Sequence, residues 1–220
     1  MQVNFNKKAA LLCALAALGI AIGILSFTSL QLPSCSTPIL PHTHFAPDVV
    51  PGKIVTLKKL REEYFIDFHN MFSIKVRDLF ESPKHITLNY TINILRYVMD
   101  LNDKGETLYY CVFDNKDNRL IGAIEVREKN DIDPGQLGCW INENYWGSGR
   151  IQEAYKLIAQ TYFSVKPQET SFNAHVRTWN IRSYKAMKKF GFTDVGTVKA
   201  SDGKADRHVL ELHRGMRQLQ

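Results

Sequence analysis

The sequence lacks the cysteine pairs and charge runs that mark several common classes of protein. Its cysteines are Cys13, Cys35, Cys111 and Cys139, and no two are spaced as Cys-x-x-Cys, so no metal or redox motif is predicted. A disulfide framework is not expected either, because Cys13 lies in an apolar run and the last two lie in predicted strands. The net charge is +6 but no long Lys/Arg run is present, which argues against nucleic-acid binding.

Charge is also scarce in the N-terminal region, where Lys7, Lys8 and Asp48 are the only charged residues before position 52. Residues 9–30 contain no charge, and an apolar run of about 19 residues suffices to cross a bilayer as a helix. We therefore predict a basic N-terminus over 1–8, then a transmembrane helix or uncleaved signal anchor over 9–30. A cleaved signal stays open as the alternative, since LPSC after this run loosely resembles a lipoprotein processing site.

The flanking charges predict the orientation of this membrane segment. Lys7 and Lys8 precede it, and no Lys or Arg follows until Lys53, so the positive-inside rule places the folded domain on the non-cytoplasmic side. Gly19 and Gly23 form a GxxxG pattern. This pattern occurs at helix-pairing faces, and a homodimer is therefore left open.

Beyond this segment, residues 31–52 are rich in Pro, Ser and Thr and are predicted to be an extended tether before a folded domain at 53–217. The domain reads as strand, two helices, three strands, helix, strand, helix, two strands. Short turns join most neighbouring strands, which favours an α/β fold of the α+β type with a mixed, largely antiparallel sheet of six or seven strands and helices on both faces. The two expected apolar helix stripes are Leu60, Tyr64, Phe68 and Phe72, then Leu88, Ile92, Leu95 and Met99.

A glycine-rich loop precedes the next helix, expected over about 150–163. The stretch NENYWGSGRIQEAY, residues 142–155, passes through Gly147 and Gly149. Such a loop exposes backbone amides at the positive end of a helix dipole, where phosphate binds readily. A Rossmann domain is not predicted, because the loop follows hairpin-type strands and Gln152 replaces the third glycine of GxGxxG. A Walker loop is excluded, because no Gly-Lys-Ser/Thr follows.

Three stretches carry a family resemblance: LGCWINENYWGSGRIQEAYKLI, NIRSYKAMKKFGFTDVG and LIGAIEV. Together they resemble the GNAT superfamily of N-acetyltransferases, most closely its RimJ/RimL-type branch, which acetylates ribosomal proteins. The resemblance covers about residues 53–213 in element order. It implies the GNAT fold, acetyl-CoA as the phosphate ligand, and transfer of the acetyl group to a primary amine of a protein N-terminus, a peptide or a small molecule. The amine would attack directly, without an acyl-enzyme.

The resemblance also implies which residues contact the coenzyme. Amides of residues 147–152, with the charge of Arg150, would hold the pyrophosphate. The strand LGCWI would bulge at Gly138 and splay from the next strand, so that its backbone amides hold the pantetheine arm and polarise the thioester. The side chains of Trp140 and Ile141 are expected to be core. The implied contacts are Cys139, Trp140, Ile141, Trp146, Gly147, Ser148, Gly149, Arg150, Ile151, Gln152, Asn180 and Ser183.

The resemblance implies Ser183 as the general acid, and Tyr184 is the second choice. Many family members have a tyrosine acid where this chain has Met187, and Tyr184 lies one helical turn earlier. A thiolate leaving group needs little protonation, because a thiol has a pKa of about 8.5. Cys139 is not expected to act as an acyl carrier, because no activating partner is visible beside it.

The general base is harder to assign from the sequence. The carboxylate often found on the coenzyme strand is replaced by Gln136. Glu125, Asp202 and His175 are the candidates, each with a competing structural interpretation: solvated surface acids for the first two, a structural histidine for the third. Of these we select Glu125.

Two questions stay open. The rival interpretation is a non-catalytic acyl-CoA-binding or membrane-anchored interaction module, favoured by Ile151 where the family prefers a small residue, by Met187 and by Gln136. The flanking charges place the domain outside the cytoplasm, whereas acetyl-CoA is expected inside it. The side of the membrane that bears the domain is therefore undecided.

Overall fold

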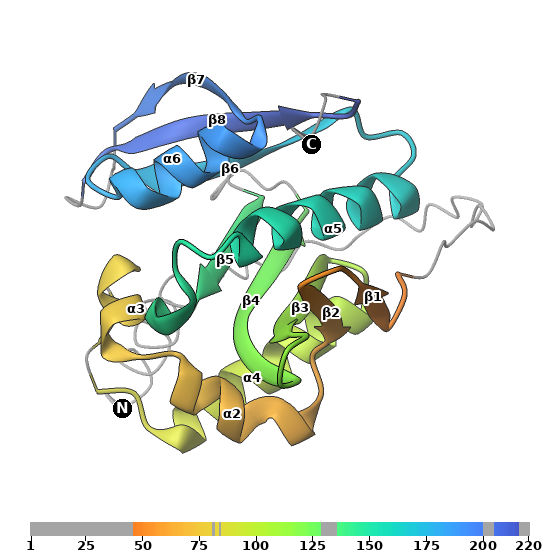
Figure 1. The fold of residues 1–220 in the computed structure, drawn as a ribbon, viewed down its shortest axis with the longest axis vertical. Helices are drawn as coiled ribbons and strands as arrows, with labels where there is room; N and C mark the ends of the chain where they lie inside the picture. Colours follow the sequence, from red (N-terminus) through yellow and green to blue (C-terminus); the bar gives the residue numbers. More distant parts are fainter. Residues whose placement is uncertain (1–45, 81, 84, 129–135, 200–204, 216–220) are drawn as a thin grey trace, which may run out of the picture.

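The computed structural model describes residues 46–80, 82–83, 85–128, 136–199 and 205–215, and these form two antiparallel sheets (Figure 1). The five-stranded sheet has the order β1-β2-β3-β4-β5 and the three-stranded sheet the order β6-β8-β7. The strands are β1 (Val49–Pro51), β2 (Val55–Lys59), β3 (Thr107–Asp114), β4 (Arg119–Arg127), β5 (Leu137–Ile141), β6 (Ser171–Arg177), β7 (Thr193–Val198) and β8 (Arg207–His213).

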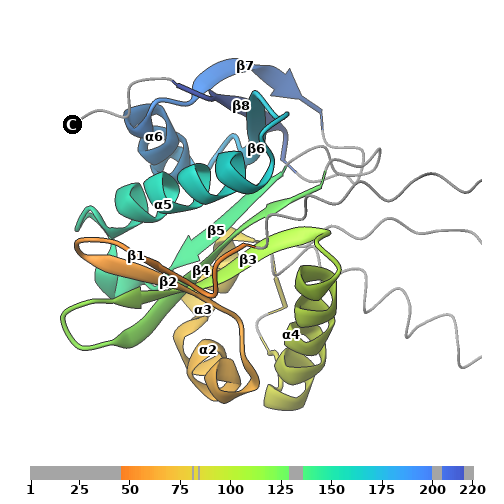
Figure 2. The same ribbon diagram turned by 90° about the vertical axis from the view of Figure 1, so that its right-hand side faces the viewer.

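The helices lie on both faces of the larger sheet, as predicted. On one face lie α2 (Phe65–Met71), which follows the 3-10 turn η1 (Glu62–Tyr64), and α4 (Leu88–Asp103); α5 (Arg150–Val165) covers the other (Figure 2). Between these elements the chain also forms α3 (Ile74–Leu79), the 3-10 turn η2 (Glu143–Tyr145), and α6 (Ile181–Phe190), which packs against α5. No helix within the described ranges is both long and apolar enough to span a membrane.

The alternation of side chains along β3 separates two hydrophobic cores. Tyr110 and Val112 face α5, whereas Cys111 and Phe113 face α2 and α4. Because successive side chains of a strand point to opposite faces, a strand covered on both faces is buried throughout, and every residue of β3 is buried. The central strand is therefore the rigid base on which both layers of helices rest.

Several sequence predictions need correction. One mixed sheet of six or seven strands was expected, whereas the described residues form two sheets with eight strands in total. The additional strand is β1, which lies in the predicted tether 31–52. All paired strands are antiparallel. The first predicted helix, over 58–72, is shorter in the structure, where it is η1 followed by α2. The helix α3 was not predicted, and Ser73 caps it by accepting from the Val76 amide. The stripe expected on α4 is rotated: Thr91, Ile94, Leu95 and Val98 are buried, while Leu88 is exposed.

Some predictions lie outside the described residues. These are the basic N-terminus 1–8, the membrane segment 9–30, the tether up to residue 45 and the base candidate Asp202. The folded part begins by residue 46 and not at 53, because β1 pairs with β2 from Val49↔Lys58 to Pro51↔Thr56.

The two sheets meet at one point and then separate. The Gln136 amide, directly before β5, donates to the Asn173 carbonyl of β6 at 3.2 Å. Beyond this contact β5 remains paired with β4 and β6 with β8, so no ladder joins β5 to β6 among the described residues. The predicted parting of these two strands is therefore confirmed, and it opens the space in which the site lies.

Candidate active site

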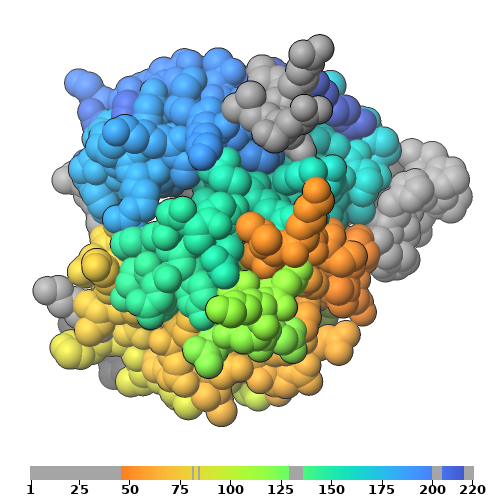
Figure 3. All heavy atoms as spheres, in the orientation of Figure 1, coloured from red at the N-terminus to blue at the C-terminus, as the bar shows by residue number. Residues whose placement is uncertain are grey.

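A cavity of about 770 Å³ occupies the space between the parted strands. Its walls come from β5, the glycine loop, the start of α5, the ends of β6, β7 and β8, α6 and α3. In Figure 3 the surface is hollowed between the blue C-terminal segments and the teal start of α5. This volume lies within the range of roughly 300–1,000 Å³ typical of small-molecule sites.

The glycine loop has the conformation that its sequence predicts. Gly147 and Gly149 have φ of 74° and 81°, a left-handed region that costs a residue with a side chain about 1–2 kcal/mol. Gly149 caps α5, and none of the amides of residues 147–151 donates a hydrogen bond to another described residue. The Gln152 amide, in contrast, donates to the Gly149 carbonyl at 3.0 Å. The loop therefore leaves the amides of residues 147–151 without an acceptor among the described residues, one amide fewer than was predicted for the phosphate.

Gln152 and Ile151, at the start of α5, have structural contacts. The Gln152 side chain donates to the Ala186 carbonyl of α6 at 2.9 Å and so joins the two helices that flank the cavity. Ile151 is half-buried against the core beneath α5. It also lines the cavity, at the position where the family prefers a smaller residue.

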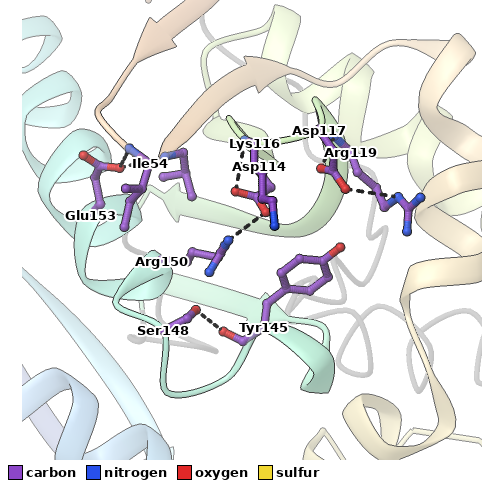
Figure 4. A network of polar contacts seen from close by, with 10 residues as sticks. Ile54, Asp114, Lys116, Asp117, Arg119, Tyr145, Ser148, Arg150 and Glu153 are labelled. Atoms are coloured by element: carbon purple, nitrogen blue, oxygen red, sulfur yellow. Dashed lines mark hydrogen bonds and ion pairs between the residues drawn. The ribbon is translucent and has the colours of Figure 1, made fainter.

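Arg150 is not directed at the loop amides that were predicted to bind phosphate. Its guanidinium donates to Asp114 of β3 at 2.8 Å (Figure 4) and lies over the Tyr145 ring, 5.3 Å from the centroid. Burial disfavours the charged form of Asp114, but the Arg150 hydrogen bond helps to hold the pKa of this carboxyl below its ordinary value. The expectation that Arg150 supplies charge to a pyrophosphate is corrected: this side chain fastens the loop to the sheet.

A second anchor holds the same helix start. The carboxylate of Glu153 accepts hydrogen bonds from the amides of Lys53, Ile54 and Val55 at 2.6–2.7 Å. Figure 4 shows Glu153 and Arg150 reaching from the first turn of α5 toward different segments of the larger sheet. Because charge-assisted bonds are the stronger ones, the loop amides have a fixed position before any ligand arrives.

The strand β5, which was predicted to contact the coenzyme, directs only some of its predicted amides into the open space. The Asn142 amide bonds the Ile121 carbonyl of β4 at 2.8 Å, and an antiparallel ladder alternates. The amides of Cys139 and Ile141 therefore point away from β4, into the open side. Trp140, paired with Ala123 in this register, directs its amide to β4. Its side chain is core, as predicted, in contact with aromatic rings of α2 and the residue after it.

Gly138 serves a different purpose from the bulge predicted for it. The β4–β5 pairing runs without a shift from Gly122↔Ile141 to Val126↔Leu137. A Cβ at Gly138 would lie 2.7 Å from Oε1 of Glu125. The glycine is needed because a buried carboxylate lies directly over the strand.

Glu125 was expected to be a surface acid, and it is buried. Its side chain is 3% exposed and its Oε1 lies 3.3 Å from Nη1 of Arg127. Gly138 and Arg127 line the cavity, as does the second base candidate, His175. Glu125 is therefore held directly behind the cavity wall.

Three hydroxyl and thiol groups meet in this wall. Asn180 caps α6 by accepting from the Ser183 amide at 3.2 Å, which orients Ser183 on the first turn. The Tyr155 hydroxyl lies 3.4 Å from Sγ of Cys139, and the Ser183 hydroxyl is close enough to it to act against the rise in the pKa of Tyr155. Burial raises the pKa of Tyr155 well above its ordinary value, so the hydroxyl stays protonated. Tyr155 was missed from the sequence because no local pattern shows that its hydroxyl lies beside Cys139 of β5 and Ser183 of α6.

Tyr184, the second acid candidate, does not reach this group. Its hydroxyl donates to Oδ2 of Asp194 at 2.8 Å and its ring stacks on His208, with centroids 4.5 Å apart. The residue is not among those that line the cavity, whereas Ser183 and Met187 are. One helical turn was the wrong offset, because the face of α6 that carries Tyr184 is turned toward β7 and β8.

The α6 helix brings three cations to the cavity that the sequence analysis overlooked. Arg182, Lys185 and Lys189 line it, and their spacing places them on one face of the helix. Arg182 lies over the Trp146 ring, 3.4 Å from the centroid, while the Trp146 indole donates to the Ile141 carbonyl at 2.7 Å. The positive charge beside the glycine loop therefore comes from α6. The spacing i, i+3, i+7 was the signal that could have revealed it.

A protein-family comparison matches residues 55–193, more than half of the chain, to the GNAT acetyltransferase domain. The chain belongs to the GNAT family. It is an acyltransferase, and acetyl-CoA is its co-substrate. No curated protein matched its sequence. The free loop amides, the α6 cations and the parted strands fit the diphosphate and the extended arm of that coenzyme.

Solved structures show the same fold at low sequence identity. A RimL ribosomal L7/L12 alpha-N-protein acetyltransferase in complex with coenzyme A is 16% identical, with a TM-score of 0.62 over 75% of this chain and 97% of that one. The microcin C7 self-immunity acetyltransferase MccE, in complex with acetyl-CoA and AMP, is 14% identical, with a TM-score of 0.61 over 74% and 93%. A ribosomal-protein-S5-alanine acetyltransferase from Vibrio fischeri is 16% identical, with a TM-score of 0.63 over 78% and 99%. The GNAT chain therefore shares the overall fold of these enzymes.

Proposed function

We propose that this protein transfers the acetyl group of acetyl-CoA to a primary amine of a protein N-terminus, a peptide or a small molecule by direct attack. The amine nitrogen bonds to the thioester carbonyl carbon, the C–S bond breaks, the amine loses one proton and the departing sulfur gains one. The observation that carries this proposal is the cavity between β5 and β6, into which the glycine loop, the Cys139 amide and Ser183 all project.

In this proposal the chain's own groups divide the work of binding. The amides of residues 147–151 and the cations of α6 hold the diphosphate, because a helix N-terminus and nearby Lys or Arg both favour anions. The outward amides of Cys139 and Ile141 hold the arm and the thioester oxygen. Much of the rate then comes from holding the two reactants together, which is worth up to about 7–11 kcal/mol in well-oriented cases.

We assign proton donation to Ser183, with Tyr155 as a positioning residue. The buried Tyr155 hydroxyl lies beside Ser183, where it can orient the serine and offer a second hydroxyl from which the serine is reprotonated. We assign proton removal to Glu125, whose carboxylate lies against the cavity wall at Gly138. An amine with a pKa near 10 must lose a proton before it can attack.

Direct attack is favoured over an acyl-cysteine route by the surroundings of Cys139. Burial raises the pKa of its thiol to about 11, although the Tyr155 hydrogen bond works in the opposite direction. Only about one thiol in ten thousand would be ionised at pH 7, and the thiolate is the nucleophile. A group held so firmly in its neutral form is a poor acyl acceptor.

The experiment that tests the function follows release of the coenzyme thiol from acetyl-CoA with a panel of amines, and identifies the acetylated product by mass spectrometry. Amine-dependent release with a stoichiometric N-acetyl product supports the proposal. Saturable coenzyme binding by calorimetry without release for any amine would favour the rival, a non-catalytic acyl-CoA-binding module.

We further propose that residues 9–30 anchor the enzyme in a membrane as a single pass. The supporting observation is the uncharged run in the sequence. Protease protection of membranes bearing the full chain locates the catalytic domain: cleavage in sealed vesicles of known orientation assigns its side. Crosslinking in the same membranes, with Gly19 and Gly23 changed to Ile, tests pairing of the segment into a homodimer.

A further inference from the structure

We infer that the acceptor amine carries an anionic group, which Arg177, Lys199 and Arg207 bind at the acceptor side of the cavity. This inference rests on the proposed function and adds the chemical class of its acceptor. The anionic group can be a carboxylate or a phosphate, since both accept charge-assisted hydrogen bonds from Arg and Lys.

The first observation is the sign of the charge around the cavity. Among the described residues, several Lys and Arg side chains line the cavity, and no Asp or Glu does. Arg150 bonds Asp114 at 2.8 Å and Arg127 lies 3.3 Å from Glu125, so carboxylates behind the wall offset the charge of these two cations. Walls of low dielectric around charges of one sign concentrate their field and attract counter-charged ligands.

The remaining cations form two groups on different elements. Arg182, Lys185 and Lys189 share one face of α6 beside the glycine loop, where the coenzyme phosphates are expected. Arg177, Lys199 and Arg207 lie at the ends of the three strands of the smaller sheet. We assign the first group to the coenzyme phosphates and the second to another ligand; within the second group Arg177 also donates a hydrogen bond to the Ala205 carbonyl at 2.6 Å.

The strand register brings the second group together. Arg207 is paired with Arg177 on one side and with Val198 on the other, and Lys199 follows Val198 directly. Figure 1 shows the end of β7 and the start of β8 on the side of the molecule where α5 begins. Like charges placed opposite one another on neighbouring strands destabilise a sheet. Arg207 and Lys199 have no ion pair with a described residue, so a bound anion would relieve this repulsion.

The test uses two sets of acceptors. The first set is three peptide amides of equal length that start with alanine and continue with Asp-Asp, Asn-Asn or Lys-Lys. The second set is a pair of small amines, phosphoethanolamine and ethanolamine. Thiol release gives KM and kcat for each acceptor. We expect the KM of the acidic peptide, the phosphorylated amine or both to be at least about tenfold below that of the neutral counterpart. The peptide arm and the small-amine arm separate a carboxylate from a phosphate.

The variant Arg207→Glu should remove this preference, lower the KM of the Lys-Lys peptide and leave the KM of acetyl-CoA unchanged. Lys156→Glu is the matched control, because it makes the same charge change at an exposed position of α5 that does not line the cavity. Calorimetry with coenzyme-loaded protein gives the same comparison as binding affinities, without relying on turnover.

Three results would overturn the inference. Equal KM values for the acidic and neutral acceptors would do so while leaving the proposed function intact. The inference would also fail if Arg207→Glu bound coenzyme A more weakly than the wild type but bound dephospho-coenzyme A equally well. In that case the cations would bind the 3′-phosphate of the coenzyme. If no acceptor is acetylated, equal calorimetric affinities for acidic and neutral peptides would decide against it.

Discussion

Gln136 and Asn173 pair through both their backbones and their side chains at the point where β5 and β6 part. The Gln136 amide donates to the carbonyl and to Oδ1 of Asn173 at 3.2 and 3.0 Å, and the Asn173 amide donates to Oε1 of Gln136 at 3.3 Å. Gln136 is 2% exposed, so none of these groups has an easy alternative in water. This pair joins the two strands beside the cavity, whose lining starts at Leu137 on β5 and at His175 on β6.

Replacing Asn173 by alanine should therefore destabilise the fold by about 0.5–1.5 kcal/mol, because it removes one of the two acceptors of the Gln136 amide while the Asn173 carbonyl still accepts from it. Urea unfolding measures the change in free energy. Asn115→Ala, at an exposed turn where the side chain bonds the Gly52 carbonyl, is the control and should cost less. Equal losses in the two variants would show that the junction has no special role.

The glycine loop gives a second prediction. In Gly149→Ala a Cβ would meet only Ile54, at 3.8 Å, but φ of +81° is unfavourable for alanine, which costs about 1–2 kcal/mol. We expect the KM of acetyl-CoA to rise, because relaxation of this strain turns the amides away from the phosphate. Gly105→Ala is the control. Gly105 has a similar φ of +74° and no atom within 4 Å of an added Cβ, but this residue lies after the end of α4 and not in the glycine loop. A loss of stability in both variants with unchanged KM in both would contradict the assignment.

Charge removal at Asp114 should have a pH-dependent effect. The pKa of Asp114 is below its ordinary value, so its ionised form stabilises the folded state above the unfolded pKa of about 3.9. That contribution is lost as pH falls through the lower folded pKa. We expect Asp114→Asn to cost about 1–3 kcal/mol at pH 7, and the difference from wild type to shrink below about pH 4. Asp117→Asn, in an exposed pair with Arg119 at 3.8 Å, should cost about 0–1 kcal/mol.

The proton donor is tested by three hydroxyl deletions. We expect Ser183→Ala to lower kcat about tenfold, a modest loss because a thiolate is a good leaving group. Tyr155→Phe should lower kcat less and leave the KM of acetyl-CoA unchanged, because it removes only the partner that orients Ser183. Tyr184→Phe is the matched control, since it loses a hydrogen bond to Asp194 away from the cavity. Unchanged kcat in the first two variants, or a comparable loss in the third, would refute the assignment.

The base assignment has its own signature in the pH profile. For Glu125→Gln we expect a fall in kcat/KM at pH 7 that diminishes toward pH 10, where a growing fraction of the amine is already neutral. A His175→Ala variant provides the comparison, because His175 lines the same cavity. If His175→Ala shows this pattern and Glu125→Gln does not, the histidine is the base.

The sequence by itself determined the order of the elements from β2 onward except for α3, the position of the glycine loop and the family. These follow from local signals: glycines that tolerate positive φ, apolar spacing, and motif residues within a few positions of one another. The face of α4 could not be read in this way. Its apolar residues fit more than one stripe, and the packing of Ile94, Leu95 and Val98 on the sheet selects one.

Only the tertiary structure decided which side chains reach the cavity. Arg150 is adjacent to the loop in sequence, yet it turns to Asp114, which lies 36 positions earlier. Ser183 meets Tyr155 and Cys139 because α5, α6 and β5 converge, and Arg207 meets Arg177 because β8 inserts between β6 and β7. The physical reason is that these contacts join residues far apart in the chain, and their partners are set by strand register and helix packing, which no local pattern encodes.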